Sequence, residues 1–480
     1  DYHMKLNMKC DMVLEDITEK KVPAMDIFAH SIKALANHLM EALERRGTGV
    51  ISNDIQWVLT VPAIWTDNAK QFMRKSAEKA GILKDHLLIS LEPEAASIYC
   101  QYLPTEKLCG AESGFTMSKV GAKYMIVDLG GGTVDITVHE KLAGGTLKEI
   151  SRATGGDCGG TSVDAEFIQL LAKIFGAPLI HTMKREQPEA YLDLLREFET
   201  VKRTITSSKQ GKVNMAIPYA TLDALCKKYL KEDLSNTLLA SPYANSISIR
   251  GDKMRIDADL FIKLFEKTVQ NISSLLQEMF SRNESESVTL ILLVGGFAEC
   301  SLVQAKIRKI FFPRRVIVPE ECDLCVLKGA VLFGHNSKAI DSRKIRVTYG
   351  VRCREMFSPR VSGQKKYLKV SDRVRSNNVF DIIIQKDTNV KQGTTIQKEN
   401  YASLKGDKVV AFDIYTSEKK SPEYTDEDGC TCIGKATMEI SDSSQSQAFQ
   451  AEFVFGNTEI SLNAVEIKSG KSCQVHVDLI

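Results

Sequence analysis

Apolar residues recur along this chain with two different spacings, and the change between them divides the sequence. As far as about residue 334, apolar positions at helical spacing alternate with short apolar runs of strand length. From about residue 345, apolar and polar residues alternate at every second position, in runs bounded by Gly, Asn and Asp. The first pattern predicts an α/β domain over residues 1–334, and the second predicts a separate antiparallel β domain over residues 346–480. The polar residues 335–345 are the predicted linker.

Within the first domain the pattern predicts strands and helices in alternation. The predicted helices, two of them capped by Asp67 and Ser301, cover residues 22–46, 67–80, 95–103, 162–175, 186–210, 257–281, 301–312 and 323–333. The predicted strands cover residues 55–61, 87–91, 124–127, 133–138 and 288–294. Proteins with this order place functional residues where strands end, and Glu92 lies at such a corner.

The stretch 124–139, YMIVDLGGGTVDITVH, predicts a β-hairpin with three glycines at its tip. Gly130, Gly131 and Gly132 allow the backbone to adopt positive φ, and their successive N–H groups can form a concave anion site. Asp128 and Asp135 place one carboxylate on each strand beside that tip. The combination indicates a phosphate site with a divalent cation or an activated water. A plain glycine-rich hairpin with a solvated Asp is the alternative.

Two further glycine clusters lie where a strand meets a helix. Gly159 and Gly160 belong to a glycine-rich turn that leads into the helix over 162–175, which suits phosphate as well as it suits a flexible surface loop. Gly295 and Gly296 follow a buried strand and precede another helix, a geometry that lets backbone approach a nucleotide. By spacing alone, the charged residues of 186–210 predict solvated ion pairs on neighbouring helical turns.

Composition excludes several classes of protein. The 63 basic and 61 acidic residues balance, so there is no basic footprint for a nucleic acid. No apolar run reaches the roughly 18 residues of a membrane span. Twelve cysteines without regular spacing favour reduced thiols in a cytoplasmic protein. Because the chain starts at Asp1 within ordinary globular sequence, we expect the natural N-terminus to be absent, so that a signal peptide would go unseen.

Other motifs carry little weight. GCTCIGKA at 429–436 departs from a P-loop because it ends in Ala, where a hydroxyl is needed for Mg²⁺, and because it lies in the predicted β domain. Cys322 and Cys325 have the C-x-x-C spacing, but no second Cys or His pair stands at metal spacing, which favours two buried helix cysteines. Neither G-x-S-x-G nor H-E-x-x-H occurs in the sequence.

Four segments in order, VPAIWTDNAKQ (61–71), LEPEAASIY (91–99), DLGGGTVD (128–135) and LVGGFAE (293–299), resemble motifs of the 70-kDa heat-shock chaperones. That family has a two-lobed, actin-like ATPase fold shared with sugar kinases. The segments VPAIWTDNAKQFM and LISLEPEAASIYC are similar to sequences of its divergent branch, heat shock 70 kDa proteins 12A and 12B. The resemblance covers about residues 3–334 strongly. Residues 346–480 resemble the family's peptide-binding β-sandwich more weakly.

The resemblance implies ATP or ADP with Mg²⁺ as ligands and assigns roles to individual residues. Asp128 would hold the Mg²⁺ shell through water, Glu92 would help orient the attacking water, and Asp135 would stand at the same edge. The residues implied to contact phosphates, ribose and base are Gly130, Gly131, Gly132, Thr133, Gly159, Gly160, Glu199, Lys202, Arg203, Thr206, Gly295, Gly296 and Asp323. For Glu199, Lys202 and Arg203 this implication replaces the solvated pairs that spacing alone predicts.

The chain also departs from the family pattern. The first phosphate loop and the catalytic lysine of the family have no counterpart here, which fits an incomplete N-terminus and predicts weak ATP binding and poor hydrolysis. Phe297 and Glu299 replace the Ser and Arg typical at the adenine. The acidic, Leu-rich interdomain linker and the helical lid have no counterpart either.

By resemblance, the expected function is that of an atypical stress-response chaperone in which nucleotide state changes polypeptide binding by the β domain. Its expected partners are unfolded or extended polypeptide and co-chaperones. A nucleotide-sensing binding or scaffold protein with negligible turnover is the alternative from another class. A small-molecule kinase of the same superfamily is a third, which the second β domain argues against.

Overall fold

A mixed sheet of eight strands lies at the centre of the computed structural model, which describes residues 8, 11–17, 19–111, 117, 119–356, 367–370 and 373–476. From edge to edge its strands are β18 (Asn389–Lys391), β14 (Ile340–Lys344), β8 (Leu147–Gly156), β7 (Val134–Lys141), β6 (Lys123–Leu129), β12 (Leu290–Val294), β13 (Arg315–Pro319) and β5 (Leu108–Cys109). β6, β7 and β8 form an antiparallel meander, whereas β6, β12 and β13 run parallel. The predicted hairpin is therefore confirmed and lies in the middle of the sheet.

Alternate side chains of β6 enter two different cores, because successive residues of a strand point to opposite faces. Met125 and Val127 belong to one buried cluster, and Tyr124 and Ile126 belong to another. The second cluster is completed by α4 (Glu92–Cys100) and α13 (Cys325–His335). α5 (Gly160–Phe175), α11 (Glu266–Phe280) and α12 (Ser301–Phe311) contribute to the first. Burial on both faces explains why this strand is apolar throughout.

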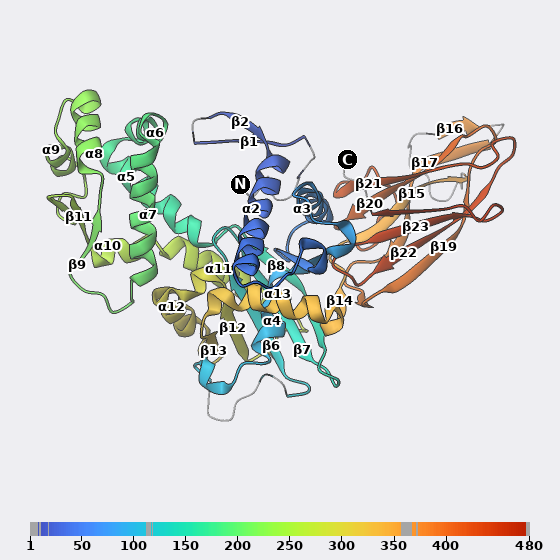
Figure 1. Cartoon of the computed structure of the whole chain (residues 1–480), viewed down its shortest axis with the longest axis horizontal. Coiled ribbons are helices and arrows are strands. Elements are labelled where there is room, and N and C mark those ends of the chain that lie inside the picture. The colour runs from blue at the N-terminus through green and yellow to red at the C-terminus, as the bar shows by residue number, and fades with distance from the viewer. Residues whose placement is uncertain are drawn as a thin grey trace.

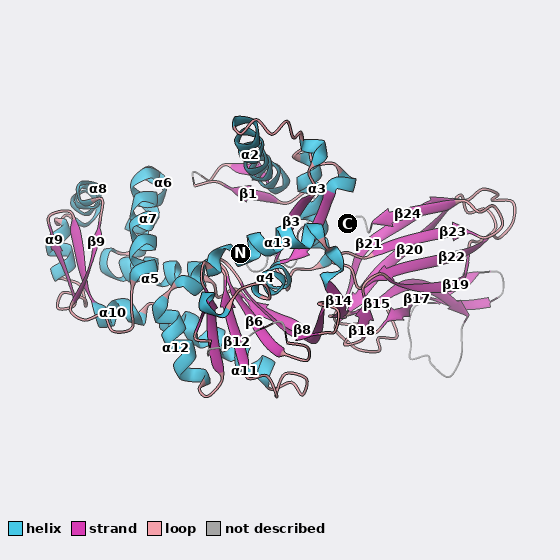
Figure 2. Ribbon diagram, turned by 60° about the horizontal axis from the view of Figure 1, so that its bottom comes forward, coloured by secondary structure: helices cyan, strands magenta, loops and turns pink. Residues whose placement is uncertain are grey.

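A smaller unit precedes the central sheet in the chain. Its elements are β1 (Val13–Glu15), β2 (Lys21–Pro23), α2 (Ala24–Arg45), β3 (Trp57–Val61), α3 (Asp67–Lys79) and β4 (Leu87–Leu91). β3 and β4 pair in parallel as a two-stranded sheet, and within the described residues β3 has no other partner strand. α2 packs beside α3, with Phe28 against Phe72, and lies away from the strands of the central sheet in Figure 2. Leu35 on the uncovered side of α2 is 74% exposed.

Two capping predictions are wrong by one residue. Thr66, not Asp67, caps α3, since its side chain accepts a hydrogen bond from the Ala69 N–H over 3.3 Å. Asp67 is the first helical residue, where its charge still favours the helix dipole. Ser301 likewise begins α12 and makes no capping bond there.

A third unit extends from the central sheet to one end of the molecule (Figure 1). Besides α5, it contains α6 (Ala177–Glu186), α7 (Pro188–Thr204), α8 (Tyr219–Leu225), α9 (Leu234–Leu239) and a sheet of β10 (Ile247–Arg250), β11 (Lys253–Asp257) and β9 (Lys212–Ala216). The single helix predicted over 257–281 is two helices, α10 (Ala258–Lys263) and α11, that meet at Leu264 and Phe265. Both of these residues are buried, so the apolar periodicity continues across the break.

Two antiparallel sheets occupy the other end of the molecule (Figure 1). One has the order β16 (Tyr367–Val370), β17 (Arg373–Ile384), β15 (Thr348–Met356), β20 (Val409–Ser417), β21 (Cys430–Glu439); the other has the order β19 (Thr394–Ala402), β22 (Ala448–Phe455), β23 (Ser461–Glu466), β24 (Ser472–His476). Val351, Phe412, Phe453 and Leu462, drawn from both sheets, share one buried cluster. The P-loop-like stretch 429–436 lies largely within strand β21, as the sequence indicated.

Residues 335–345, the predicted linker, hold the end of α13, a short 3-10 turn and strand β14. β14 pairs in parallel with β8 and antiparallel with β18. Arg343 of β14 is buried and makes two hydrogen bonds of 2.7 Å to Glu94 at the start of α4. It also donates to the carbonyl of Gly456. This segment therefore joins the central sheet, α4 and the C-terminal strands, and the domain boundary stays a prediction.

Candidate nucleotide site

The β6–β7 register places Asp128 directly opposite Asp135. Both carboxylates are buried, with 5% and 1% of the residue exposed. Glu92, the first residue of α4, lies close enough for both to affect its ionisation. The structure thus brings together the three acidic residues that the sequence singled out, from three different elements.

Burial raises the pKa of all three acids. It is the main cause for Asp128, whose pKa rises to about 7 with a further contribution from Asp135. The pKa of Asp135 rises to about 6, because burial outweighs the hydrogen bonds that it accepts and the nearby Arg346. Burial and the two aspartates raise the pKa of Glu92 well above its usual range. A cation beside these groups would stabilise their charged forms.

The two glycine-rich turns are joined at the hairpin tip. The N–H groups of Gly160 and Thr161 donate to the carbonyls of Gly130 and Gly131 over 3.1 and 2.8 Å. A Cβ on Gly159 would lie 2.5 Å from the Gly130 oxygen, so that only glycine fits this close approach. Within the described residues, no backbone bond uses the N–H of Gly131 or Gly132. The tip therefore presents free donors while its carbonyls are turned toward the second loop.

Gly295 closes the other side of the acidic group. It has a φ of +89°, and a Cβ there would lie 2.3 Å from Asp128 Oδ1. Gly296 follows as the first residue of a 3-10 turn that also contains Phe297. Gly295 is thus required by the position of Asp128 itself, whereas a Cβ on Gly296 would meet nothing within 4 Å.

The charged residues of α7 pair with one another and with α5. Lys202 Nζ lies 2.6 Å from Asp164, 2.5 Å from Glu199 and 3.2 Å from the Gly160 carbonyl. These three partners match the three protons of its ammonium group. Glu199 also accepts from Arg203 over 2.9 Å, and Arg203 reaches Glu299 over 3.4 Å. Although burial acts to raise it, hydrogen bonds from Lys202 and Arg203 lower the pKa of Glu199.

A cavity of about 140 Å³ opens between this cluster and the hairpin tip. Its lining contains six of the predicted site residues, namely Gly131, Gly160, Glu199, Lys202, Arg203 and Gly296. The other four lining residues are Thr161, Asp164, Phe297, which the resemblance places at the adenine, and Cys300. Pockets that enclose whole ligands usually span about 300–1,000 Å³. The cavity is therefore the size of one part of a nucleotide.

Ten of the sixteen predicted site residues do not line this cavity, and two of these ten lie at the surface. Thr206 is exposed, and its hydroxyl pairs with Ser208. Asp323 is exposed as well, but it lies near enough to raise the pKa of Arg203, after the larger effect of Glu199. Neither residue contacts the hairpin tip through any hydrogen bond in the described part of the chain.

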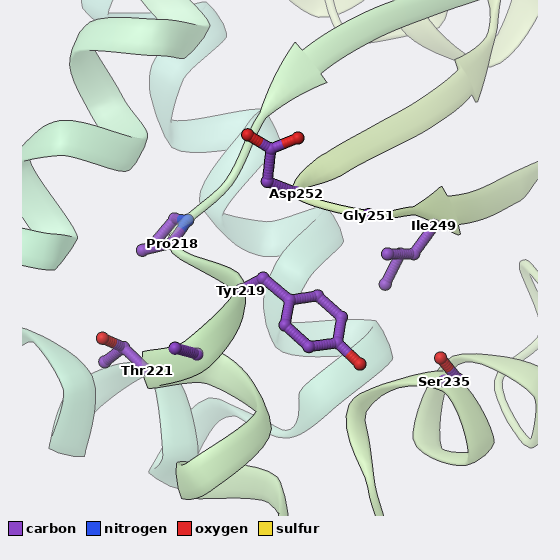
Figure 3. Close-up of a pocket in the computed structure, with 8 residues that line it drawn as sticks. Pro218, Tyr219, Thr221, Ser235, Ile249, Gly251 and Asp252 are labelled. Carbon is purple, nitrogen blue, oxygen red and sulfur yellow. The ribbon is translucent and has the colours of Figure 1, made fainter.

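Two larger cavities lie elsewhere. One of about 540 Å³ lies where α8 meets the β9–β11 sheet, with the Tyr219 ring directed toward Ile249 and Ser235 (Figure 3). Another, of about 450 Å³, lies between residues 63–70 and the C-terminal strands. The first shares no lining residue with the predicted site. Size alone would therefore direct attention away from the acidic hairpin.

Sequence reasoning missed two side chains of this site. Thr161 donates from its hydroxyl to the Gly131 carbonyl over 2.9 Å, and Asp164 holds Lys202. Thr161 lies inside the second glycine cluster, and Asp164 follows Gly160 by one helical turn. Their nearness to a predicted phosphate turn was the available signal.

The donor set fits Mg²⁺ with nucleotide. No group of three or more His, Cys, Asp or Glu among the described residues is placed to hold a metal alone. Mg²⁺ usually takes only one or two carboxylates, and water and substrate phosphates complete its shell. Asp128 and Asp135 supply such carboxylates, and the free N–H groups of the tip suit phosphate oxygens.

Among the helices of the described residues, none combines the length and the apolar character that a membrane span requires.

Comparisons with known proteins give the family of the chain. The family model described as Hsp70 protein matches residues 4–346. Heat shock 70 kDa protein 12A of Homo sapiens and that of Mus musculus are each 32% identical over 537 residues, covering 100% of this chain and 79% of the relative. Heat shock 70 kDa protein 12B of Homo sapiens is 31% identical over 546 residues with the same coverage. The chain therefore belongs to the Hsp70 family, which implies the actin-like, two-lobed ATPase fold.

Proposed function

We propose that this chain is an atypical chaperone of the 70-kDa heat-shock class, which binds Mg–ATP at the β6–β7 hairpin. The observation that carries the proposal is the meeting of three acids with a glycine tip whose N–H groups are free. A plain structural hairpin does not need to bury opposed carboxylates, because isolated buried charge is unfavourable. The Hsp70 family uses nucleotide and a divalent metal in general, which supports the same site.

In this proposal each residue has a role that follows from its position in the site. The N–H groups of Gly131 and Gly132 bind the β- and γ-phosphates, and Gly159 and Gly160 hold the tip from the second loop. Asp128 would hold Mg²⁺ with Asp135 at its edge, and the ion, when bound, would supply charge stabilisation at the phosphates. Glu92 orients a water molecule toward the γ-phosphate.

The α7 cluster takes the sugar and base in this proposal. Glu199 and Lys202 line the 140 Å³ cavity with Gly296, and Arg203 stands at its rim with Asp323 nearby. Each Glu199 oxygen already accepts one bond, from Lys202 or from Arg203, and its remaining lone pair is an acceptor for a ribose hydroxyl. Because Lys202 has a partner for each proton, it acts on the ribose through Glu199.

We assign polypeptide binding to the β domain over 346–480, as a β-sandwich that adds an extended segment to a sheet edge. Its two antiparallel sheets with a common core support this assignment. It meets the ATPase part through polar contacts, among them Arg74 with Glu459 at 2.7 and 2.5 Å and Tyr349 with Asp67 at 2.6 Å. Such contacts can be exchanged when nucleotide changes the balance between two arrangements.

A nucleotide-sensing scaffold with negligible turnover is the second candidate. In this sequence the family's first phosphate loop and catalytic lysine have no counterpart, which favours it, since such a cation stabilises the transferring phosphate. Hydrolysis is then slow even where binding is retained. ATP would act as a ligand whose differential affinity selects one arrangement.

Calorimetric titration with Mg–ATP tests the site. We expect binding to the chain and at least tenfold weaker binding to Asp128→Asn. Asp252→Asn, at the distant cavity of Figure 3, is the matched control and should bind like the unchanged chain. Equal binding by all three proteins would contradict the assigned site.

Peptide competition with and without Mg–ATP separates the two candidates, together with phosphate release under the same conditions. A nucleotide effect on peptide binding with measurable turnover supports the chaperone. A nucleotide effect without turnover supports the scaffold. If Mg–ATP binds and leaves peptide affinity unchanged, the coupling between the two parts is contradicted.

A further inference from the structure

The loop between β3 and α3 is held from two sides by groups distant in the sequence. On one side, the Ile64 N–H donates to Asp135 Oδ1 over 2.9 Å. On the other, Arg346 Nη2 donates to the Ile64 carbonyl over 2.7 Å, and its Nη1 donates to the carbonyls of Ala63 and Trp65. The same peptide segment therefore contacts an acidic residue of the candidate site and Arg346, which lies two residues before β15.

Only a guanidinium suits the second contact. Arginine carries five N–H donors in a rigid planar fork, so that it can serve several carbonyls at once. Arg346 does this for three successive residues of one loop. Lysine could carry the same charge, but its ammonium is a point donor on a flexible stem and would not fix the course of the loop.

The loop has little freedom to move independently of these contacts. The Ile64 side chain lies against Gly155, where an added Cβ would come within 2.9 Å of it. Arg346 is itself fixed, since its neighbour Ile345 exchanges backbone bonds of 2.9 and 2.8 Å with residues 387–388. A shift of Arg346 would therefore be passed to Ile64 rather than absorbed between them.

We propose that Arg346 is a positioning residue for Asp135, acting through its clamp on residues 63–65. The clamp holds the Ile64 N–H at the carboxylate opposite Asp128, so that the acidic face of the hairpin depends on the segment that enters the C-terminal strands. The reverse also holds, because coupling free energy between two sites is reciprocal. The effect of Arg346 on nucleotide affinity rests on the proposed function, whereas its effect on the Ile64 N–H does not.

Amide hydrogen exchange of Ile64 tests the positioning role without nucleotide. We expect at least tenfold faster exchange in Arg346→Gln, although the direct acceptor Asp135 is unchanged in that protein. Asp135→Asn should accelerate the same amide, and the double variant should match the faster single variant, because both changes act on one contact. Unchanged exchange in Arg346→Gln, or multiplicative effects in the double variant, would overturn the proposal.

Two further variants separate the clamp from charge and from general destabilisation. Arg346→Lys should behave like Arg346→Gln if the fork matters; exchange like the unchanged chain would overturn the clamp. Arg352→Gln removes an arginine of β15 that pairs with Asp413 and does not contact the loop, so it should leave Ile64 exchange unaltered. Arg352→Gln matching Arg346→Gln would likewise overturn it. A thermal melt of each variant shows which of them are folded.

Mg–ATP affinity completes the test. We expect about fivefold or greater weakening in Arg346→Gln, the lower end of typical coupling between sites, and none in Arg352→Gln. Faster Ile64 exchange with no Mg–ATP binding to the unchanged chain would retain the positioning role and contradict the proposed function. Normal Mg–ATP affinity in Arg346→Gln, where the unchanged chain binds, would overturn the effect of Arg346 on the site.

Discussion

Two groups of charged side chains face the candidate nucleotide site, and they are balanced in opposite ways. Asp128, Asp135 and Glu92 are acids gathered by β6, β7 and α4, and each has a raised pKa. On α7, Lys202 and Arg203 are surrounded by carboxylates that they neutralise. Cations among the described residues do not balance the negative charge of the first group. The charges of the second group balance one another.

This difference separates binding from structure within one site. A group that is complete without ligand contributes to the folded state, and breaking it leaves a buried charge unpaired. A group that is incomplete without ligand costs stability in the free protein and gains when a cation binds. Substitutions in the two groups should therefore have effects of opposite sign on stability.

The largest effect is expected for Lys202→Met. It leaves Asp164 and Glu199 without their buried partner, and should lower the free energy of unfolding by about 2–3 kcal/mol, below the usual 3–5 because both acids are partly exposed. Thermal denaturation measures the change. Lys267→Met, which removes an exposed partner of Glu166, is the control and should cost under about 1 kcal/mol. Similar losses in both proteins would show that the α7 group is not the structural one.

Asp128→Asn should have the opposite sign. The pKa of Asp128 rises on folding from 3.8 to about 7, so its contribution favours folding at low pH and is lost as pH rises through about 7. The amide avoids that loss, and we expect the free protein to gain roughly 1–3 kcal/mol at pH 8 and almost nothing at pH 4. Melts at both pH values measure this. Destabilisation at pH 8 would contradict the comparison.

A purely steric effect of similar size distinguishes the two loops that meet at the hairpin tip. Gly159→Ala would bring a Cβ within 2.5 Å of backbone oxygen, and should cost about 1–3 kcal/mol. Gly131→Ala has open space within 4 Å and should change stability little, while it weakens Mg–ATP binding by crowding the phosphate side. Melting and calorimetry on both variants check the pair. A stable Gly159→Ala would mean that the two loops are not held together as tightly as their bonds indicate.

The smallest effect is expected for Glu299→Gln. This residue pairs with Arg203 at 3.4 Å on an exposed rim, and such pairs contribute little, so we expect a stability change within about 0.5 kcal/mol. Thermal denaturation of this variant and of Lys202→Met compares the stability contributions of the exposed and the buried pairs of the α7 group. A loss of stability above 1 kcal/mol would show that Glu299 belongs to the structural centre of the α7 group and not to its exposed rim.

Sequence pattern predicted the fold best where one local signal dominated. The two-faced strand β6 and the glycine hairpin followed from residue type and spacing alone, because parallel strands buried on both faces are apolar throughout. The sequence pattern gave the wrong helix cap where two adjacent residues could both act as caps. Thr66 and Asp67 are both capping residues, and only the extended backbone of Thr66 decides between them. The break at Leu264 was hidden because both helices keep the same apolar face.

The site divides in the same way. Its glycines and acids stand in short motifs and could be found, but the partners that position them come from far along the chain. Lys202 meets Asp164 across 38 positions, and Arg346 meets Ile64 across 282. No periodicity records such contacts, since they depend on how whole elements pack. The resemblance to a family supplied Lys202, and neither source supplied Arg346.

The uncovered side of α2 and the edge of β3 that has no partner strand in the described part of the chain bear on how this protein behaves in solution. Leu35 is 74% exposed, and Trp57 to Thr60 are only partly buried along an edge strand. The formal net charge is only +2, so repulsion between molecules is weak. Light scattering should therefore show an attractive interaction between protein molecules that grows with concentration and salt, because these apolar surfaces associate. Because the sequence pI is about 7.9, a dilute buffer at a pH well away from 8 is the practical starting point for handling it.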